Sequence, residues 1–180
     1  MLKCMMYCLV ISFALVACSS PKPPMTPQLE AAYAKQKRDK KISDMEKQLQ
    51  AGGVTVIHLG QQSMLVLPTD KFFFIDSSHL NGANYATLNI LSDYISLFDV
   101  ETVKVSGYSD NCGDPLRAVA LSRQQAQNIA DYLKNQEIKA PIIYAIGYGC
   151  TFPIADNQRS DGRAMNKRIQ ITFYRLDPRR

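Results

Sequence analysis

The feature that most constrains the fold is an alternation of β-rich runs and helical segments after residue 53. β-rich runs occupy residues 54–59, 63–67, 102–108, 141–148 and 168–175, and helical segments occupy residues 82–98 and 117–135. The apolar run 72–75 predicts a further strand or a bend. This order is typical of a two-layer α/β (α+β) sandwich with helices on one face of a mixed sheet. A chain of 180 residues has enough material for one such domain, which we place at residues 54–180.

Both helical segments carry apolar residues at helical spacing, which predicts the side that each buries. In residues 82–98 the expected core face consists of Ile90, Leu91, Tyr94 and Phe98. In residues 117–135 it consists of Val119, Ala126, Ile129, Ala130 and Leu133. Between the first two β-rich runs, Gly60-Gln61-Gln62 predicts the turn of a hairpin.

The first residues are typical of a bacterial export signal. Lys3 precedes an apolar run at residues 5–15 that is too short to span a bilayer. Leu15-Val16-Ala17-Cys18 resembles the lipobox, in which cleavage leaves a lipidated cysteine at the new N-terminus. We therefore expect a signal peptide at residues 1–17, lipid on Cys18 and, because no Asp follows Cys18, the outer membrane as the destination. An ordinary secretory signal with an unrelated cysteine is the alternative.

Residues 18–27 are polar and rich in proline, which predicts an extended tether between the lipid and the folded part. Residues 28–53 then predict a charged helix that stops at Gly52-Gly53. Its middle, Lys35–Lys41, carries five basic residues and one acidic residue. A solvated helix face is one interpretation of this segment. Contact with anionic envelope polymers or a protein partner is the other.

Charge and composition argue against several classes of function. The formal net charge is +5, and it falls to +4 when the signal peptide with Lys3 is removed. This small excess, without a basic groove interleaved with aromatic residues, does not predict a nucleic-acid partner. His58 and His79 are isolated and show neither metal-ligand spacing nor the order of a catalytic triad. We therefore expect no metal, no cofactor and no enzyme activity.

Four motifs carry a resemblance to a known family: Ser106–Gly113 (SGYSDNCG), LSRQQA at 121–126, YAIGYG at 144–149 and GRAMNKR at 162–168. Residues 63–174 resemble the OmpA C-terminal-like, peptidoglycan-binding domain. The resemblance implies a βαβαβ-β architecture and, as ligand, the diaminopimelate of the peptidoglycan stem peptide. It implies that Asp110 accepts the ligand ammonium, that Ser109 supports the carboxylate end, and that Gly107 and Tyr108 shape the turn. The alternative role for Asp110 is to cap that turn.

The same family places an arginine where this chain has Gln125. A neutral amide in place of a guanidinium is expected to cost ~1–2 kcal/mol of binding free energy. Arg123 lies about 200° away around the helix and is no simple substitute, whereas Arg117 near the helix start is a candidate second cation. In the family, the later motifs are loops that brace the pocket wall, so we expect a loop at residues 162–168 and a supporting role for Arg163, Asn166 and Arg168.

Two cysteines lie beyond the expected signal peptide and the lipidated Cys18. They are Cys112, two residues after Asp110, and Cys150, two residues after Tyr148. If the strands that end there are parallel neighbours, Cys112 and Cys150 lie at one edge of the sheet. We expect them to form a disulfide in the oxidising periplasm, worth ~3–4 kcal/mol in the entropic treatment. Two buried free thiols are the alternative.

The combined hypothesis is an outer-membrane lipoprotein whose periplasmic domain holds the membrane or an envelope assembly to peptidoglycan. The small size, lipobox and lone domain also resemble the DotK/IcmN lipoprotein family of Dot/Icm type IVB secretion systems. The alternative is a structural subunit of an envelope secretion complex with reduced or no peptidoglycan binding.

Overall fold

The computed structural model describes residues 26–110 and 113–176. The expected signal peptide, the lipidated Cys18, most of the tether and Cys112 lie outside the described residues. Within the described ranges, no helix has both the length and the apolar character needed to cross a membrane.

One mixed sheet of five strands forms the centre of the domain, which confirms the predicted fold class. The strands are β1 (Thr55–Leu59), β2 (Gln62–Pro68), β3 (Thr102–Tyr108), β4 (Ile142–Gly147) and β5 (Arg168–Tyr174), in the spatial order β1-β2-β5-β3-β4. β3 and β4 are parallel neighbours, and all other pairs are antiparallel. Gly60 has a φ of 64° in the tight turn of the predicted β1–β2 hairpin, since Leu59 already pairs with Gln62.

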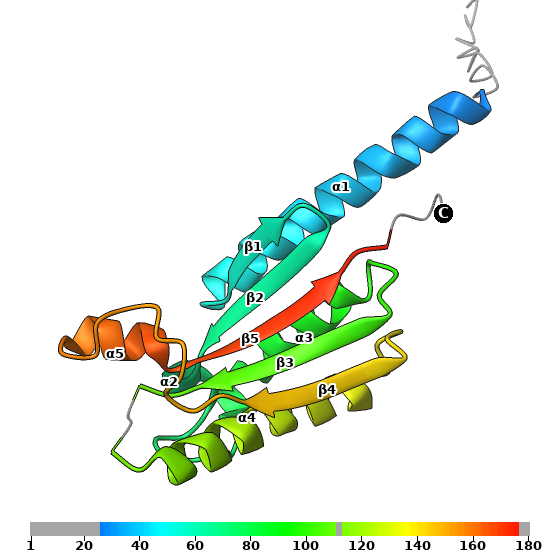
Figure 1. Cartoon of the computed structure of the whole chain (residues 1–180). Helices are drawn as coiled ribbons and strands as arrows, with labels where there is room; N and C mark the ends of the chain where they lie inside the picture. Colours follow the sequence, from blue (N-terminus) through cyan, green and yellow to red (C-terminus); the bar gives the residue numbers. More distant parts are fainter. Residues whose placement is uncertain (1–25, 111–112, 177–180) are drawn as a thin grey trace, which may run out of the picture.

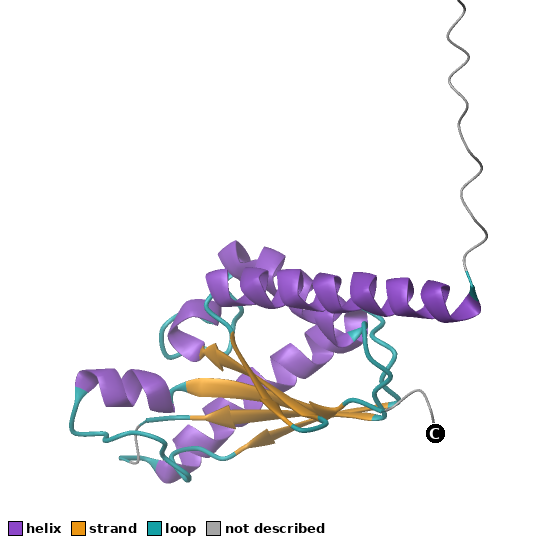
Figure 2. Ribbon diagram, turned by 90° about the horizontal axis from the view of Figure 1, so that it is seen from above, coloured by secondary structure: helices purple, strands orange, loops and turns teal. Residues whose placement is uncertain are grey.

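The helices are α1 (Pro27–Ala51), α2 (Thr69–Phe72), α3 (Tyr85–Ile95) after the short 3₁₀ turn η1 (Gly82–Asn84), α4 (Pro115–Asn135) and α5 (Ser160–Asn166). Figure 1 shows α1, α3 and α4 behind the sheet, and Figure 2 looks down on the twisted sheet with α1 along one side. Thr26 and Asp114 cap α1 and α4 by accepting hydrogen bonds from backbone N–H groups of their first turns.

A hydrophobic core fills the space between the helices and the sheet. Alternate residues of β3 and β5 point into it, and Val103, Val105, Ile169 and Ile171 are fully buried. The C-terminal part of α1 joins the same core through Met45 and Leu49, while its first turns extend past the sheet (Figure 1). The expected face of the segment 82–98 is confirmed for Leu91, Tyr94 and Phe98, with Ile90 half-buried.

Three local predictions were wrong. Val119 is 41% exposed, because α4 turns Ala118 and Ser122 toward the sheet and leaves Val119 against the backbone of Gly149. The segment 82–98 is not one helix, since α3 ends at Ile95. The motif 162–168, expected to be a loop, lies mostly within α5, whose seven residues are too few to show a clear helical period. For the run 72–75, the bend is the correct one of the two predicted forms. Phe72 is the last residue of α2, and the bend that follows has one bridge, from Phe73 to Leu80.

Candidate ligand site at the carboxyl end of strand β3

Two glycines allow helix α4 to lie directly on the ends of β3 and β4. A Cβ atom on Gly107 would meet the carbonyl oxygen of Ser122 at 2.0 Å, and one on Gly147 would meet the backbone nitrogen of Arg123 at 2.4 Å. No side chain fits at either distance, so this close packing requires glycine. The result is that α4 places Ser122 and Gln125 over the end of β3.

The turn after β3 is tied to the turn after β4. The backbone N–H of Ser109 donates to the carbonyl of Gly149 at 2.7 Å. The N–H of Gly149 in turn donates to the hydroxyl of Ser122 at 3.0 Å. These bonds fix the direction in which the chain leaves β3 and therefore the position of Asp110.

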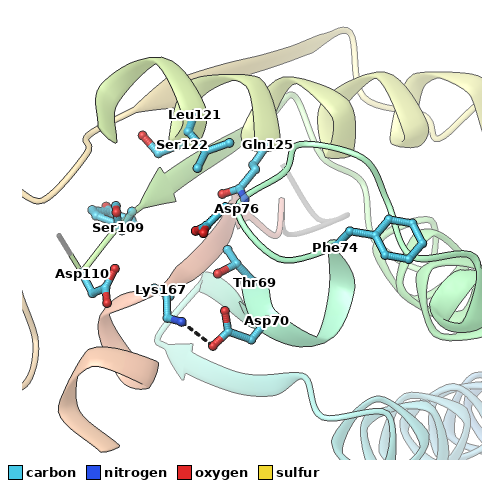
Figure 3. A pocket seen from close by; sticks show the side chains of 11 residues that line it. Thr69, Asp70, Phe74, Asp76, Ser109, Asp110, Leu121, Ser122, Gln125 and Lys167 are labelled. Carbon is cyan, nitrogen blue, oxygen red and sulfur yellow. Dashed lines mark ion pairs between the residues drawn. The ribbon is translucent and has the colours of Figure 1, made fainter. Parts of the chain in front are cut away.

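Asp110 lies in a cleft at this end of the sheet, beside α2, α5 and the start of α4 (Figure 3). The cleft has a narrow part of about 50 Å³ and a wider part of about 320 Å³. Residues that line both parts are Asp76, Ser109, Asp110, Leu121 and Lys167. Thr69, Asp70, Phe74, Tyr108, Ser122 and Gln125 line only the narrow part, and Asp114, Arg117 and Ala118 only the wider part.

A loop of residues 73–80, here called the Asp76 loop, forms one wall of the cleft. Its ends are joined by the Phe73–Leu80 bridge and by a 3.1 Å hydrogen bond from the N–H of Phe74 to the carbonyl of His79. At its tip Asp76 has a φ of 50°, in the left-handed region that few residues other than glycine adopt. The strained backbone is held by the loop closure, and it presents the Asp76 carboxylate to the cleft (Figure 3).

Helix α4 holds the Asp76 loop in place through two side-chain amides. Gln125, only 7% exposed, donates from Nε2 to the carbonyl of Ser77 at 2.9 Å. Asn128, one turn further on, donates to the carbonyl of Ser78 at 2.6 Å. Gln125, at the position of the family arginine, therefore lines the cleft and uses one of its two N–H donors to position the loop.

Lys167 supplies a cation to the same cleft. Its Nζ atom lies 2.6 Å from Oδ2 of Asp70, and its side chain is 34% exposed. Its carbonyl also accepts a hydrogen bond from the N–H of Thr69 at 3.1 Å, which joins the end of α5 to the start of α2. The Lys167 ammonium is thus fixed at the cleft wall, and its remaining N–H donors are available to the cleft.

The charges of the cleft have both signs. Asp70, Asp76, Asp110 and Asp114 supply carboxylates, and Lys167 and Arg117 supply cations. A small ligand that carries an ammonium and a carboxylate matches such a lining, because each of its charges finds a partner of opposite sign.

Arg168 lies behind the cleft wall rather than in it. It is 3% exposed, and its guanidinium lies 3.9 Å from the centre of the Tyr108 ring. Burial lowers the pKa of Arg168. The Tyr108 ring also stacks on the Tyr148 ring, with 5.2 Å between the two ring centres. Arg168 therefore contacts and supports the turn residue Tyr108, while its role in a ligand pocket stays a prediction.

Asn166 and Arg163 brace the loop between β4 and α5. Fully buried Asn166 accepts from the N–H groups of Ile154 and Ala155 at 2.8 and 3.1 Å and donates to the carbonyl of Ala155 at 2.8 Å. Arg163 donates to the carbonyl of Asn157 at 3.1 Å. Neither residue lines the cleft, so the support that they give it is indirect.

Two arginines and two histidines complete the residues considered in the sequence analysis. Arg117 is exposed and lines the wider part of the cleft, whereas Arg123 is exposed and does not line it. His58 hydrogen-bonds Ser63 and Glu46, and His79 hydrogen-bonds Ser77. Among the described residues, no group of three or more acidic, histidine or cysteine side chains is placed to hold a metal ion.

Cys150 is disulfide-bonded, which argues against the alternative that it is a buried free thiol. Cys112 lies outside the described residues, so its pairing with Cys150 stays a prediction. The parallel pairing of β3 and β4, on which that prediction depended, is present.

Sequence reasoning did not find Asp76, Asp70 or Lys167. Lys167 carried a weak signal, since it lies within the GRAMNKR motif between Asn166 and Arg168, two residues that we expect to support the pocket. Asp76 and Asp70 lie in no such motif. Their approach to Asp110 depends on the hydrogen bonds of the Asp76 loop to α4 and on the contacts of α2 with Lys167.

The fold and the cleft define a small two-layer domain with a candidate ligand site at the carboxyl end of a strand. The model of the OmpA family matches residues 72–167, more than half of the chain, and the chain belongs to this family. The match includes the Asp76 loop, Asp110, Gln125 and Lys167.

Similar proteins come from several bacterial envelopes. The chain is 30% identical to the probable lipoprotein YiaD of Escherichia coli K12, over 77% of this chain and 63% of YiaD. It is 35% identical to the peptidoglycan-binding protein ArfA of Mycobacterium tuberculosis H37Rv, over 53% of this chain and 29% of ArfA. It therefore spans less than two thirds of the length of either relative. Among solved structures, the cell wall anchor of the type VI secretion system of Pseudomonas aeruginosa matches with a TM-score of 0.65 and 25% identity, over 75% of this chain and 97% of that one.

Proposed function

We propose that this protein binds peptidoglycan without catalysis, and that its cleft holds the zwitterionic end of the diaminopimelate in the stem peptide. The observation that carries this proposal is the meeting of Asp110 and Asp76 in one cleft of an OmpA-family domain. Two carboxylates suit an ammonium group, which donates up to three hydrogen bonds. Relatives named as a peptidoglycan-binding protein and a cell wall anchor support the same ligand class.

The wider proposal is an outer-membrane lipoprotein on the periplasmic side. Lipid on Cys18 would anchor one end, the tether and α1 would span the gap, and the cleft would grip the wall. The lipobox at 15–18 and the lipoprotein relative YiaD support this arrangement. A component of a Dot/Icm type IVB secretion system, similar to the DotK/IcmN lipoprotein, is the narrowest form of the proposal, and it rests on the organisation of the chain alone.

A second candidate function is that of a structural subunit of an envelope secretion complex with reduced or no wall binding. The bond from Gln125 to Ser77 favours it, because the residue at the family arginine position is a neutral amide and one of its two N–H donors is bonded inside the protein. The two candidates differ in whether the cleft holds a wall peptide at all.

Co-sedimentation of the full chain, kept in detergent, with purified sacculi tests the proposal. We expect wild type to sediment with the sacculi, and Asp110→Asn and Asp110→Ala to lose most of this binding. Asp93→Asn is the matched control, because Asp93 is exposed on α3 and outside the cleft. Wild type that stays in the supernatant while it co-purifies with envelope proteins would instead support the structural subunit.

A further inference from the structure

We infer that Lys167, and not Gln125 or Arg117, pairs with the ligand carboxylate and makes the cleft selective for a diaminopimelate whose carboxylate is free rather than amidated. This inference rests on the proposed function, since it concerns the same cleft and the same ligand. It assigns a specificity-determining role to a residue that also forms an ion pair within the protein.

The ligand carboxylate needs a cation, because the cleft already holds several carboxylates. Placed near Asp76 and Asp110 without a cation, a further anion would be repelled. Gln125 is neutral, and one of the two N–H donors on its Nε2 atom is bonded to Ser77. Arg123 does not line the cleft. Lys167 and Arg117 are the remaining cations among the described lining residues.

Position favours Lys167 over Arg117. Lys167 lines both parts of the cleft together with Asp76 and Asp110, whereas Arg117 lines only the wider part. A ligand whose ammonium lies between the two aspartates can therefore meet Lys167 from either part of the cleft, and Arg117 only from the wider part. Figure 3 shows Lys167 between Asp110 and Asp70.

Preorganisation favours Lys167 as well. The Asp70 carboxylate holds the Lys167 ammonium at 2.6 Å, which leaves two of its three N–H donors for the ligand. About two thirds of the Lys167 side chain is covered, so solvent screens its charge less than that of exposed Arg117. A fixed cation loses less side-chain freedom on binding than a mobile one.

Titration calorimetry of the full chain in detergent with two muropeptides tests the inference. One muropeptide carries diaminopimelate with a free carboxylate, and the other carries the carboxamide at that position. We expect wild type to bind the free acid about tenfold to a hundredfold more tightly. Lys167→Met should bind the two muropeptides equally, whereas Lys167→Arg should keep the preference. Lys134→Met is the matched control, because Lys134 is exposed near the end of α4 and outside the cleft.

The outcomes separate the inference from the proposed function. If wild type binds neither muropeptide, both fail. If Lys167→Met still prefers the free acid, or if Arg117→Gln is the variant that loses the preference, peptidoglycan binding stands and the role of Lys167 is overturned. Thermal unfolding of each variant shows that a lost preference is not a lost fold, and binding of the carboxamide by Lys167→Met shows directly that its cleft is intact.

Discussion

The side-chain amide of Gln125 donates a 2.9 Å hydrogen bond to the backbone carbonyl of Ser77, a residue 48 positions earlier in the chain. This bond joins the buried face of α4 to the loop that presents Asp76. The family resemblance predicts a ligand contact at the position of Gln125. In the structure, Gln125 supports the loop that presents Asp76, which is another candidate for ligand binding. The chemistry of the cleft therefore depends on how well α4 holds this loop.

Replacing Gln125 by leucine should loosen the Asp76 loop. The carbonyl of half-buried Ser77 loses its partner, which costs about 1 kcal/mol of unfolding free energy. Urea unfolding measures this loss, and amide hydrogen exchange should show faster exchange in residues 73–80. Gln127→Leu is the matched control, since Gln127 lies on the same helix and bonds exposed Asp131. Equal stability of the two variants would contradict a supporting role for Gln125.

Substitutions at Asp76 should separate backbone strain from charge. Asp76→Gly removes the left-handed penalty on an L-residue, which is worth up to about 1 kcal/mol of stability, but it deletes the carboxylate. Asp76→Asn keeps a side chain that tolerates this conformation and loses only the charge. We expect the glycine variant to unfold at equal or higher urea concentration than wild type, and both variants to bind sacculi less. Full binding by Asp76→Asn would exclude a role for the Asp76 charge.

A methyl group at Gly107 should push α4 away from β3. An added Cβ would lie 2.0 Å from the backbone carbonyl of Ser122, and a backbone atom cannot move aside alone. Overpacking of this kind costs about 1–3 kcal/mol or more, and here it should also displace Gln125. Thermal unfolding of Gly107→Ala tests the expectation. Gly82→Ala serves for comparison, because its Cβ would meet only ordinary contacts at 3.6 Å or more. A stable Gly107→Ala domain would show that α4 can shift.

Tyr94 should make the domain lose stability in alkaline solution. Burial, followed by the hydrogen bond that its hydroxyl donates to Glu46 at 2.9 Å, raises the pKa of Tyr94 well above its ordinary value of 10.0. Above pH 10.0 the unfolded chain releases the tyrosine proton, while the folded chain retains it because its pKa is higher. The unfolded state then binds fewer protons, so the free energy of unfolding falls as the pH rises. Its full contribution is present below pH 10.0.

Urea unfolding between pH 9 and 11 compares wild type with Tyr94→Phe. The phenylalanine variant should be less stable than wild type at neutral pH, and the difference should shrink as the pH rises. Tyr33→Phe is the control, because Tyr33 is exposed on α1 and its change should not alter the slope. A constant difference between wild type and Tyr94→Phe would contradict the proton linkage.

Much of the architecture could be predicted because it is written in local patterns. The period of two in residues 102–108 and 168–175 reflects one buried face of each strand, and these boundaries agree with the structure within one residue. The parallel pairing that brings Tyr108 and Tyr148 together follows from the helix between their strands. Short elements were missed. α5 and α2 have seven and four residues, and neither is long enough to show a period.

The sequence by itself determined the layered α/β domain and placed Asp110 just beyond a strand, because hydrophobic periods and turn residues act over a few neighbours. Only the tertiary structure decided which charges meet Asp110. Asp76 and Lys167 are far from Asp110 along the chain, and they reach the cleft through the closure of a strained loop and an ion pair to Asp70. The role of Gln125 was decided in the same way, since a side-chain amide takes its meaning from the partner that packing brings to it.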